Sequence, residues 1–533
     1  MFISSHFFNV NLNLERTVIS SAVQTVRPAK FAGVTYNREV IELQARPHKH
    51  WQHRCPQCME SCRVYDYQSG MVSWRAGTYN GEPVYLTYSP ARIKCPEHGV
   101  IREYLPWVAG RSWFTLDFCN EVAWAAMFMP KTAVSAFYQI SWQAVGTCIK
   151  IAHDHIEPDI SQRLVGLRRI CVDETSYSKG QKYITVVYDM DRCQVVWIKD
   201  GHGFEIFQEF CLSLTEEQRA KIEIVAGDGA KWIDTCTFLY FPNAHRCIDN
   251  FHFVGWANDA VDDARSDAVR EARQVYVETE RRFLEGIEVS TEALEKAQAE
   301  LEEAEQSGDT QKAATLKKYI KAIKDINEGK KVNKINRLRN LLTPEQRQVL
   351  KDLKAIAKDL KNARYAVGKN PENRTENQEE KLKVIEANSP TLYKAYELKE
   401  ELREISHMKN VKSAEAELDR WIEKAKNSGI PAFVKLAEKV ERHRENLLNT
   451  IRYGANSSQS ESCNAKIKKI IRRAQGYRNL DTLSAMIYLE CSDLVIPLPH
   501  RHQFTSEQIA ERRRLAREMR QRREAARRSS RAA

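Results

Sequence analysis

The sequence has no run of about 18 or more consecutive apolar residues, so no membrane-spanning helix is expected. Its first residues combine neither a basic segment nor a clean apolar core, and a secretory signal is therefore not expected. The 13 cysteines do not form a disulfide framework. We expect reduced, buried thiols of a cytoplasmic protein at the positions that stand singly in apolar stretches. These are Cys148, Cys171, Cys193, Cys211, Cys236 and Cys247.

The length of 533 residues suggests several domains, and 42% hydrophobic and 29% charged residues are ordinary for a soluble protein. The net charge is +11, and residues 505–533, with ten Arg and four Glu, contribute +6 of it. A basic tail suits a polyanionic partner, because Lys and Arg release counterions from phosphates. A solvated helix that keeps the protein soluble would have the same composition.

Residues 168–255 contain short apolar runs and helical spacing in the order β-β-β-α-β, which predicts an α/β domain. One run ends at Asp173 and another at Asp228. Acidic residues at strand ends point into the clefts of open α/β sheets. Two neighbouring carboxylates are tolerated when they share divalent cations, and paired metals promote in-line displacement at phosphorus. Taken alone, each Asp would more often be an ordinary turn residue.

Residues 256–450 are charged and poor in β-branched runs, and they predict an all-helical segment with several hairpins. Thr343-Pro344-Glu345-Gln346 is a helix start with an N-cap and proline at the first position, and Ser389-Pro390 is another. Heptad-like apolar spacing occurs at Leu294, Ala297, Leu301 and Ala304.

Residues 55–98 hold a cysteine cluster. Cys55 and Cys58 form a Cys-x2-Cys pair, and Cys95 and His98 form a Cys-x2-His pair. Two such pairs can close a tetrahedral structural Zn²⁺ site. Other residues compete with His98 for the position of the fourth zinc ligand. The alternative to a zinc site is a set of reduced cysteines that bind no metal. The competing ligands are Cys62, His48, His50 and His53.

Residues 130–152 read as two helices joined by a tight turn near residues 139–141, with Ser141 as N-cap of the second helix. The pattern fits a helix-turn-helix, although any helical hairpin resembles one. Its second helix would present Gln143, Thr147 and Lys150 to a DNA groove.

Three blocks resemble the bacterial insertion-sequence transposases of the ISL3 type, which belong to the DDE superfamily. They are VDETSYSKGQKYITVVYDMD at 172–191, NAHRCIDNFHFV at 243–254, and SESCNAKIKKIIRRAQGYRNLDTL at 460–483. They occur in the family's order, and the last block is the most specific. The family also carries an N-terminal zinc-finger-like module, usually with Cys at most ligand positions, so that His98 is a departure.

The resemblance implies an RNase H-like fold with a catalytic triad at Asp173, Asp228 and Glu461, which would hold Mg²⁺ or Mn²⁺. Glu461 would precede an amphipathic helix whose basic face could hold a DNA phosphate. The neighbours expected at this site are Glu174, Asp249, His252 and Asn464. Further DNA contacts are expected from Lys466, Lys469, Arg472 and Arg473. Glu174 is expected beside the metal ligands rather than among them, because successive strand residues face opposite sides. His252 could position the scissile phosphate, but a histidine between two phenylalanines is more often structural.

These observations predict a multidomain α/β and all-α chain. Residues 1–45 carry no assignable pattern, 46–110 would form the zinc module, and 111–165 the helix-turn-helix region. The catalytic core would run over 166–255 and 451–495, interrupted by the helical insertion 256–450 and followed by the basic tail 496–533. The expected function is a transposase that binds terminal inverted repeats and cleaves and transfers DNA strands. A catalytically silent, domesticated DNA-binding regulator is the alternative, and a helical scaffold built on 256–450 is a weaker one.

The expected partners are the terminal inverted repeats and target DNA, with no membrane. A homodimer or higher oligomer is expected because two element ends must be held together. The expected location is the bacterial cytoplasm, in association with the nucleoid.

Overall fold

The computed structural model describes residues 12, 14–31, 33–67, 69–108, 112–178, 180, 182–248, 250–285, 291–327, 339, 342–455, 458–477, 479–498, and six positions between 507 and 518. The chain forms two compact units, Met1–Ala244 with Ser457–Ala533, and His245–Asn456. Across the described ranges, no helix has the length and apolar character needed to span a bilayer. Most of the basic tail expected at 496–533 lies outside the described residues.

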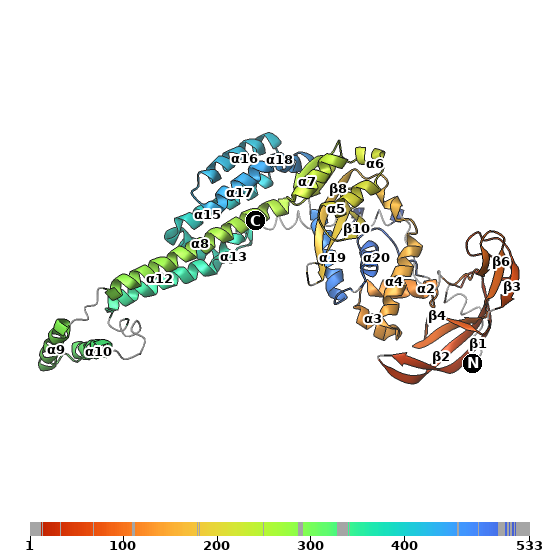
Figure 1. Cartoon of the computed structure of the whole chain (residues 1–533), viewed down its shortest axis with the longest axis horizontal. Coiled ribbons are helices and arrows are strands. Elements are labelled where there is room, and N and C mark those ends of the chain that lie inside the picture. Colours follow the sequence, from red (N-terminus) through yellow and green to blue (C-terminus); the bar gives the residue numbers. More distant parts are fainter. Residues whose placement is uncertain are drawn as a thin grey trace. The chain divides into compact units, whose positions relative to one another are not determined.

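The first unit begins with a four-stranded sheet (Figure 1), which joins two strands of the unassigned N-terminal segment to two strands from within the predicted zinc module. Its strand order is β1 (Thr17–Phe31), β2 (Val34–Pro47), β5 (Glu82–Tyr88), β4 (Val72–Tyr79). Strands β1 and β2 form a long antiparallel hairpin, and Gly33 takes the positive φ that its turn requires. Its outer part exposes Val23 and Val26 and fully buries none of its described side chains, so apolar residues do not mark an inner face there and the usual strand signal is weak.

The second sheet of this unit carries the cysteine cluster. It has the order β3 (Arg63–Tyr67), β6 (Ala91–Cys95), β7 (Gly99–Arg102), and a short 3-10 helix, η1 (Lys49–Trp51), precedes it. Glu103 links the two sheets, because its buried carboxylate accepts hydrogen bonds from the Tyr88 hydroxyl at 2.9 Å and the Ala91 amide at 2.7 Å. The same carboxylate accepts the His53 amide at 2.8 Å, which anchors the loop that leads to Cys55.

Three helices follow: α2 (Leu116–Ala126), α3 (Lys131–Tyr138) and α4 (Trp142–Ile156), then the 3-10 helix η2 (Ile160–Leu164). The turn predicted between the last two α-helices is confirmed. Gln139 adopts the left-handed conformation, and the Ser141 hydroxyl accepts the Ala144 amide as an N-cap. Lys131, the first residue of α3, is buried, and its ammonium lies 3.4 Å from the ring centroid of Trp142, the first residue of α4. Burial lowers the pKa of Lys131 to about 8.

The predicted order β-β-β-α-β is confirmed, except that a second short helix precedes the last strand. The elements are β8 (Arg169–Ser178), β9 (Lys182–Asp189), β10 (Gln194–Asp200), α5 (Phe204–Ser213), α6 (Glu216–Ala220), β11 (Ile224–Gly227) and α7 (Lys231–Tyr240). Within this unit the strands lie in the order β10-β9-β8-β11, in which β8 is antiparallel to β9 and parallel to β11. Helices α19 (Ser458–Arg473) and α20 (Leu480–Glu490) return to this region. Helix α19 packs on β8, and α20 packs on β10 and on α4.

The singly placed cysteines are free thiols and, with one exception, buried as predicted. The exception is Cys193, which is exposed because it lies in the turn between β9 and β10, where it adopts a positive φ.

The second unit contains the helices predicted for 256–450. After strand β12 (His245–Ile248) come α8 (Asn250–Glu285), α9 (Thr291–Gln306), α10 (Thr310–Asn327), α12 (Pro344–Asn362), α13 (Arg364–Gly368), η3 (Pro371–Asn373), α14 (Glu376–Asn388), α15 (Pro390–Ser406), α16 (Val411–Lys426), α17 (Pro431–Arg442) and α18 (Arg444–Tyr453). Both predicted helix starts are confirmed at Thr343 and Ser389, and the first has a complete capping box with Gln346. Helices α8 and α12–α18 supply the unit's main hydrophobic core.

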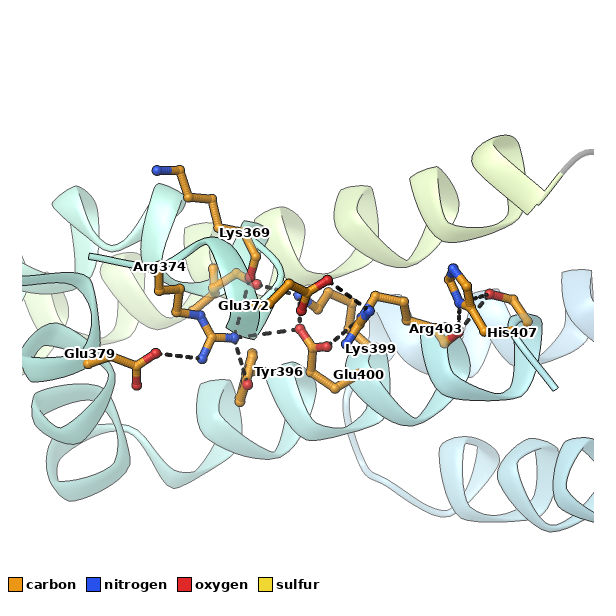
Figure 2. A network of polar contacts seen from close by, with 11 residues as sticks. Lys369, Glu372, Arg374, Glu379, Tyr396, Lys399, Glu400, Arg403 and His407 are labelled. Carbon is orange, nitrogen blue, oxygen red and sulfur yellow. Dashed lines mark hydrogen bonds and ion pairs between the residues drawn. The ribbon is translucent and has the colours of Figure 1, made fainter. Parts of the chain in front are cut away.

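A buried polar network runs along α15 (Figure 2), which supplies Lys399, Glu400 and Arg403. The Lys399 side chain is 1% exposed, and its ammonium donates to the Val367 carbonyl at 2.9 Å and pairs with Glu400. Arg403 donates to the other Glu400 oxygen at 2.7 Å, and Arg374 lies 3.6 Å from the same carboxylate. The Glu400 carboxylate therefore neutralises several cationic side chains in the buried interior of the bundle. Removal of one partner from such a buried ion pair strongly lowers the free energy of unfolding.

Candidate active site

Asp173 does not end its strand, which corrects the expectation from the apolar run at 170–172. It lies in the middle of β8, because the antiparallel pairing with β9 continues as far as Ser178 and Lys182. The parallel pairing with β11, in contrast, stops at Val172 and Gly227. Asp173 therefore stands where β8 loses its neighbour on one side.

Asp228 follows the last residue of β11, at the strand end that the sequence predicts. Since Gly227 is paired in parallel with Val172, the two next residues along these strands are Asp228 and Asp173. The structure thus brings the two predicted aspartates to neighbouring positions at one edge of the sheet. Both are partly exposed. The Asp228 carboxylate accepts the Ala230 amide at 3.0 Å, which fixes the turn into α7.

Glu174 is also close to this pair, although it is the next residue along β8. Its carboxylate accepts the amide of Gly203 at 3.1 Å, at the loop that starts α5. Burial raises the pKa of Glu174, and the negative charges of Asp228 and Asp173 raise it further against the lowering effect of the Gly203 bond. The local negative potential is the environment in which carboxylates attract divalent cations.

Helix α19 reaches the same edge through Asn464. The Asn464 side-chain amide donates to the Asp173 carboxylate, and its carbonyl accepts the hydroxyl of Tyr188. Tyr188 of β9 is paired with Cys171 of β8. Because Cys171 and Asp173 are two residues apart on β8, the side chains of all three residues lie on the same face of the sheet. Burial raises the pKa of Tyr188 well above the usual range, so the phenol is a proton donor at neutral pH. Sequence reasoning missed Tyr188, because only the strand register reveals this contact.

Glu461 lies inside the first turn of α19 rather than before the helix, because α19 begins at Ser458. Its side chain is outside the described part of the structure. Of the other residues proposed to contact DNA from this helix, Lys466, Lys469 and Arg472 are exposed. Arg473 is instead mostly buried and forms an ion pair with Glu490 of α20.

Two further residues expected near the site belong to the second unit. Asp249 lies outside the described residues. His252 is half-buried in the first turn of α8. Their relation to the two aspartates therefore stays a prediction.

Four side chains of the cysteine cluster converge as the sequence predicts. The ligand atoms of Cys55, Cys58, Cys95 and His98 all lie within 4.8 Å of one another. Cys58 Sγ is 3.7 Å from Cys95 Sγ, and Cys95 Sγ is 3.5 Å from His98 Nδ1. A tetrahedral site with Zn–S bonds of about 2.3 Å has S···S edges of about 3.8 Å. These two spacings are therefore close to those of a tetrahedral Zn²⁺ site.

The thiols of this cluster differ in acidity: against a lowering backbone hydrogen bond at Glu60, burial and the neighbouring thiols of Cys55 and Cys95 raise the pKa of Cys58 to about 11. The backbone amide of His98 donates to Cys95 Sγ and lowers the pKa of this thiol to about 6. A thiolate is the form that coordinates a metal. Of the competing ligands, Cys62 Sγ donates instead to the Glu60 carbonyl at 3.4 Å, and the Nε2 atom of His53 lies 4.0 Å from the Glu103 carboxylate.

The second helix of the predicted DNA-binding unit presents the three expected polar side chains. Gln143, Thr147 and Lys150 are exposed on α4, while Val145 and Ile149 are buried against the rest of the unit. The Lys150 ammonium pairs with Asp154 at 3.0 Å, so a phosphate would have to compete with this carboxylate. The helical hairpin thus has an exposed polar face suited to a DNA groove.

Comparison with known proteins identifies the class and the family. Residues 170–342 and 333–487 match the profile of the ISL3-type DDE family, described as a transposase. A transposase for insertion sequence element IS1557, from two strains of Mycobacterium tuberculosis, is 31% identical over 462 residues, which are 87% of this chain and 91% of the relative. A transposase for insertion sequence element IS1001 from Bordetella parapertussis is 23% identical over 430 residues, or 80% of this chain and 85% of the relative.

With this match, the mixed sheet that carries paired aspartates defines the class of protein as a DDE-type transposase, an enzyme that cleaves and transfers DNA. The chain belongs to the ISL3-type family of transposases.

Proposed function

We propose that this chain cuts DNA at the ends of an insertion element and joins the released ends to target DNA. Asp173, Asp228 and Glu461 are its metal ligands, on an RNase H-like core. The observation that carries the proposal is the bond from Asn464 to Asp173, because it fixes α19 on the strand that bears the first aspartate. Residues three apart share one face of a helix, so Glu461 is expected on the face of Asn464.

The aspartate pair is suited to Mg²⁺ or Mn²⁺, because its oxygen donors are partly exposed and close together at a sheet edge. Bound divalent cations would activate the attacking oxygen and stabilise the leaving oxygen at phosphorus. The protein's own contribution is to orient the ligands. Asn464 holds one oxygen of Asp173, and the Ala230 amide holds one oxygen of Asp228.

The remaining modules recognise DNA. Gln143, Thr147 and Lys150 of α4 read the terminal inverted repeats, and Lys466, Lys469 and Arg472 contact phosphates beside the active site. Cys55, Cys58, Cys95 and His98 bind a structural Zn²⁺ that stabilises the small β3-β6-β7 sheet. The enzyme acts in the bacterial cytoplasm. It works as a homodimer or higher oligomer, because the two ends of the element must be held together.

Cleavage of DNA carrying the element ends tests this function. Asp173→Asn, Asp228→Asn and Glu461→Gln should each abolish cleavage and leave binding to the ends largely intact. Full cleavage by these variants would overturn the triad. Specific binding without cleavage by the wild-type chain would instead favour a DNA-binding regulator.

A further inference from the structure

The helices α9 and α10 form a hairpin (Figure 1). An apolar seam lies between them. Three alanines of α9, Ala293, Ala297 and Ala304, are buried, as are Ile320 and Ile323 of α10. Gly308 adopts a positive φ in the turn between them, which any other residue would strain. Small residues on one helix and larger ones on the other allow the two helices to pack closely.

This hairpin is small for an independent unit. It spans residues 291–327, and the main hydrophobic core of its unit is made by β12, α8 and α12–α18. Structures below about 40 residues usually need oligomerisation, a metal or disulfides to be stable. The hairpin also leaves its larger apolar side chains only half-buried. These are Leu294 and Leu301 of α9 and Leu316 and Tyr319 of α10.

The two helices carry opposite charges. Helix α9 has six Glu and one Lys, a net charge of −5, whereas α10 has five Lys and one Asp, a net charge of +4. Lys317 and Glu305 form an ion pair inside the hairpin at 2.6 Å. Further acidic and basic residues point outward, including Glu295 and Glu302 on α9 and Lys318 and Lys321 on α10.

We propose that the α9–α10 hairpin is a self-association arm that docks on the same hairpin of a second copy of this chain. In a two-fold symmetric four-helix bundle, α9 of each copy faces α10 of the other, so both contacts pair acidic with basic helices. The half-buried leucines would be covered by the same contact. A DNA partner fits less well, because the acidic helix would lie beside any phosphates bound by α10.

The arm is separate from the proposed metal site, so its failure would leave the catalytic proposal standing. The test is the mass of the full-length chain by sedimentation or by light scattering after size exclusion. One variant carries Glu295→Lys and Glu302→Lys, and the other carries Lys318→Glu and Lys321→Glu. All four positions are exposed, and Glu and Lys have similar helix propensities, so each hairpin should still form. Far-UV circular dichroism checks this.

The wild-type chain should have twice its chain mass of 61.6 kDa. Each variant alone should need at least about tenfold more protein to associate, because several pairs become repulsive at once. An equimolar mixture of the two variants should recover the association, since the introduced lysines of one variant face the introduced glutamates of the other and the unchanged pair of helices keeps its opposite charges. The matched control, Lys351→Glu with Lys358→Glu on the exposed face of α12, should associate like the wild type.

Three results would contradict the proposal that the α9–α10 hairpin is a self-association arm. They are a monomeric wild-type chain, variants that associate normally, and variants whose mixture does not recover. If the α10 variant lost only DNA affinity while it still associated, the basic helix would be a DNA contact instead.

Discussion

The hydrogen bonds that join Tyr188, Asn464 and Asp173 predict a graded loss of activity. Asn464→Ala removes the donor that orients the Asp173 carboxylate, and Tyr188→Phe removes only the hydroxyl that orients Asn464. Asn464→Asp keeps the shape of the side chain but turns an oxygen toward Asp173 in place of the amide. It should therefore be at least as harmful as the alanine variant.

The expected loss of activity depends on whether the hydrogen bond that is removed involves a charged group or two neutral groups. A hydrogen bond to a charged group is worth about 1.5–3 kcal/mol, and a neutral one about 0.5–1.5 kcal/mol. At about 1.4 kcal/mol for each factor of ten, Asn464→Ala should lower cleavage by roughly 10–100-fold. This is the usual range for partners of metal ligands, about 10–100-fold. Tyr188→Phe acts through Asn464 and should cost less than about tenfold.

The assay is the initial rate of end cleavage at several Mg²⁺ concentrations. Because the two residues act on a metal ligand, part of the loss should be recovered at high Mg²⁺. Tyr177→Phe is the control, since Tyr177 is on the same strand as Asp173 but its hydroxyl binds Asp200, an exposed contact. Wild-type rates for both Asn464 variants would refute this account of how α19 is attached.

Removal of other contacts should have equally defined effects. Elemental analysis should find about one zinc ion bound to each wild-type chain. The Cys95→Ser variant should lose this zinc, whereas the Cys62→Ser variant should keep it. Equal zinc contents in the two variants would exclude the proposed ligand set. Glu400→Gln leaves Lys399 and its neighbours unneutralised and should destabilise the second unit by about 3–5 kcal/mol in denaturant unfolding. Glu379→Gln, at the exposed rim of the same network, should cost less than about 1 kcal/mol, and equal losses would contradict the role of burial. Burial lowers the pKa of Lys131 to about 8. The unfolded chain therefore binds an extra proton between about pH 8 and the unfolded-lysine value of about 10.4, and stability should rise with pH across that window. Lys131→Met should remove this rise, and an identical pH profile for variant and wild type would contradict it.

Local sequence features predicted the elements whose signals are local. Helix starts at Thr343 and Ser389 and the turn before Ser141 follow from capping residues and were confirmed. The convergence of Cys55, Cys58, Cys95 and His98 was likewise predictable from paired spacings. The choice of His98 over Cys62 was not, because the fold of the intervening strands decides which side chain arrives.

The errors occurred where pairing rather than composition decides the structure. The apolar run before Asp173 ends at Val172, but β8 continues because β9 still offers hydrogen-bond partners to its polar half. The N-terminal hairpin was unassigned because its outer part exposes valines on a two-stranded ribbon. The contact of Tyr188 with Asn464 joins residues far apart in sequence, and no single-sequence pattern reports it.

The central claim is that Asp173 and Asp228 hold metal for DNA cleavage. The most direct measurement is nicking of DNA with both element ends, in Mg²⁺ and in EDTA, by the wild type and Asp228→Asn. The control is Asp191→Asn, an exposed aspartate in the β9–β10 turn. The account predicts Mg²⁺-dependent nicking at the ends by the wild type and the control, and none by Asp228→Asn. Nicking by Asp228→Asn at the wild-type rate, or nicking that persists in EDTA, would contradict it.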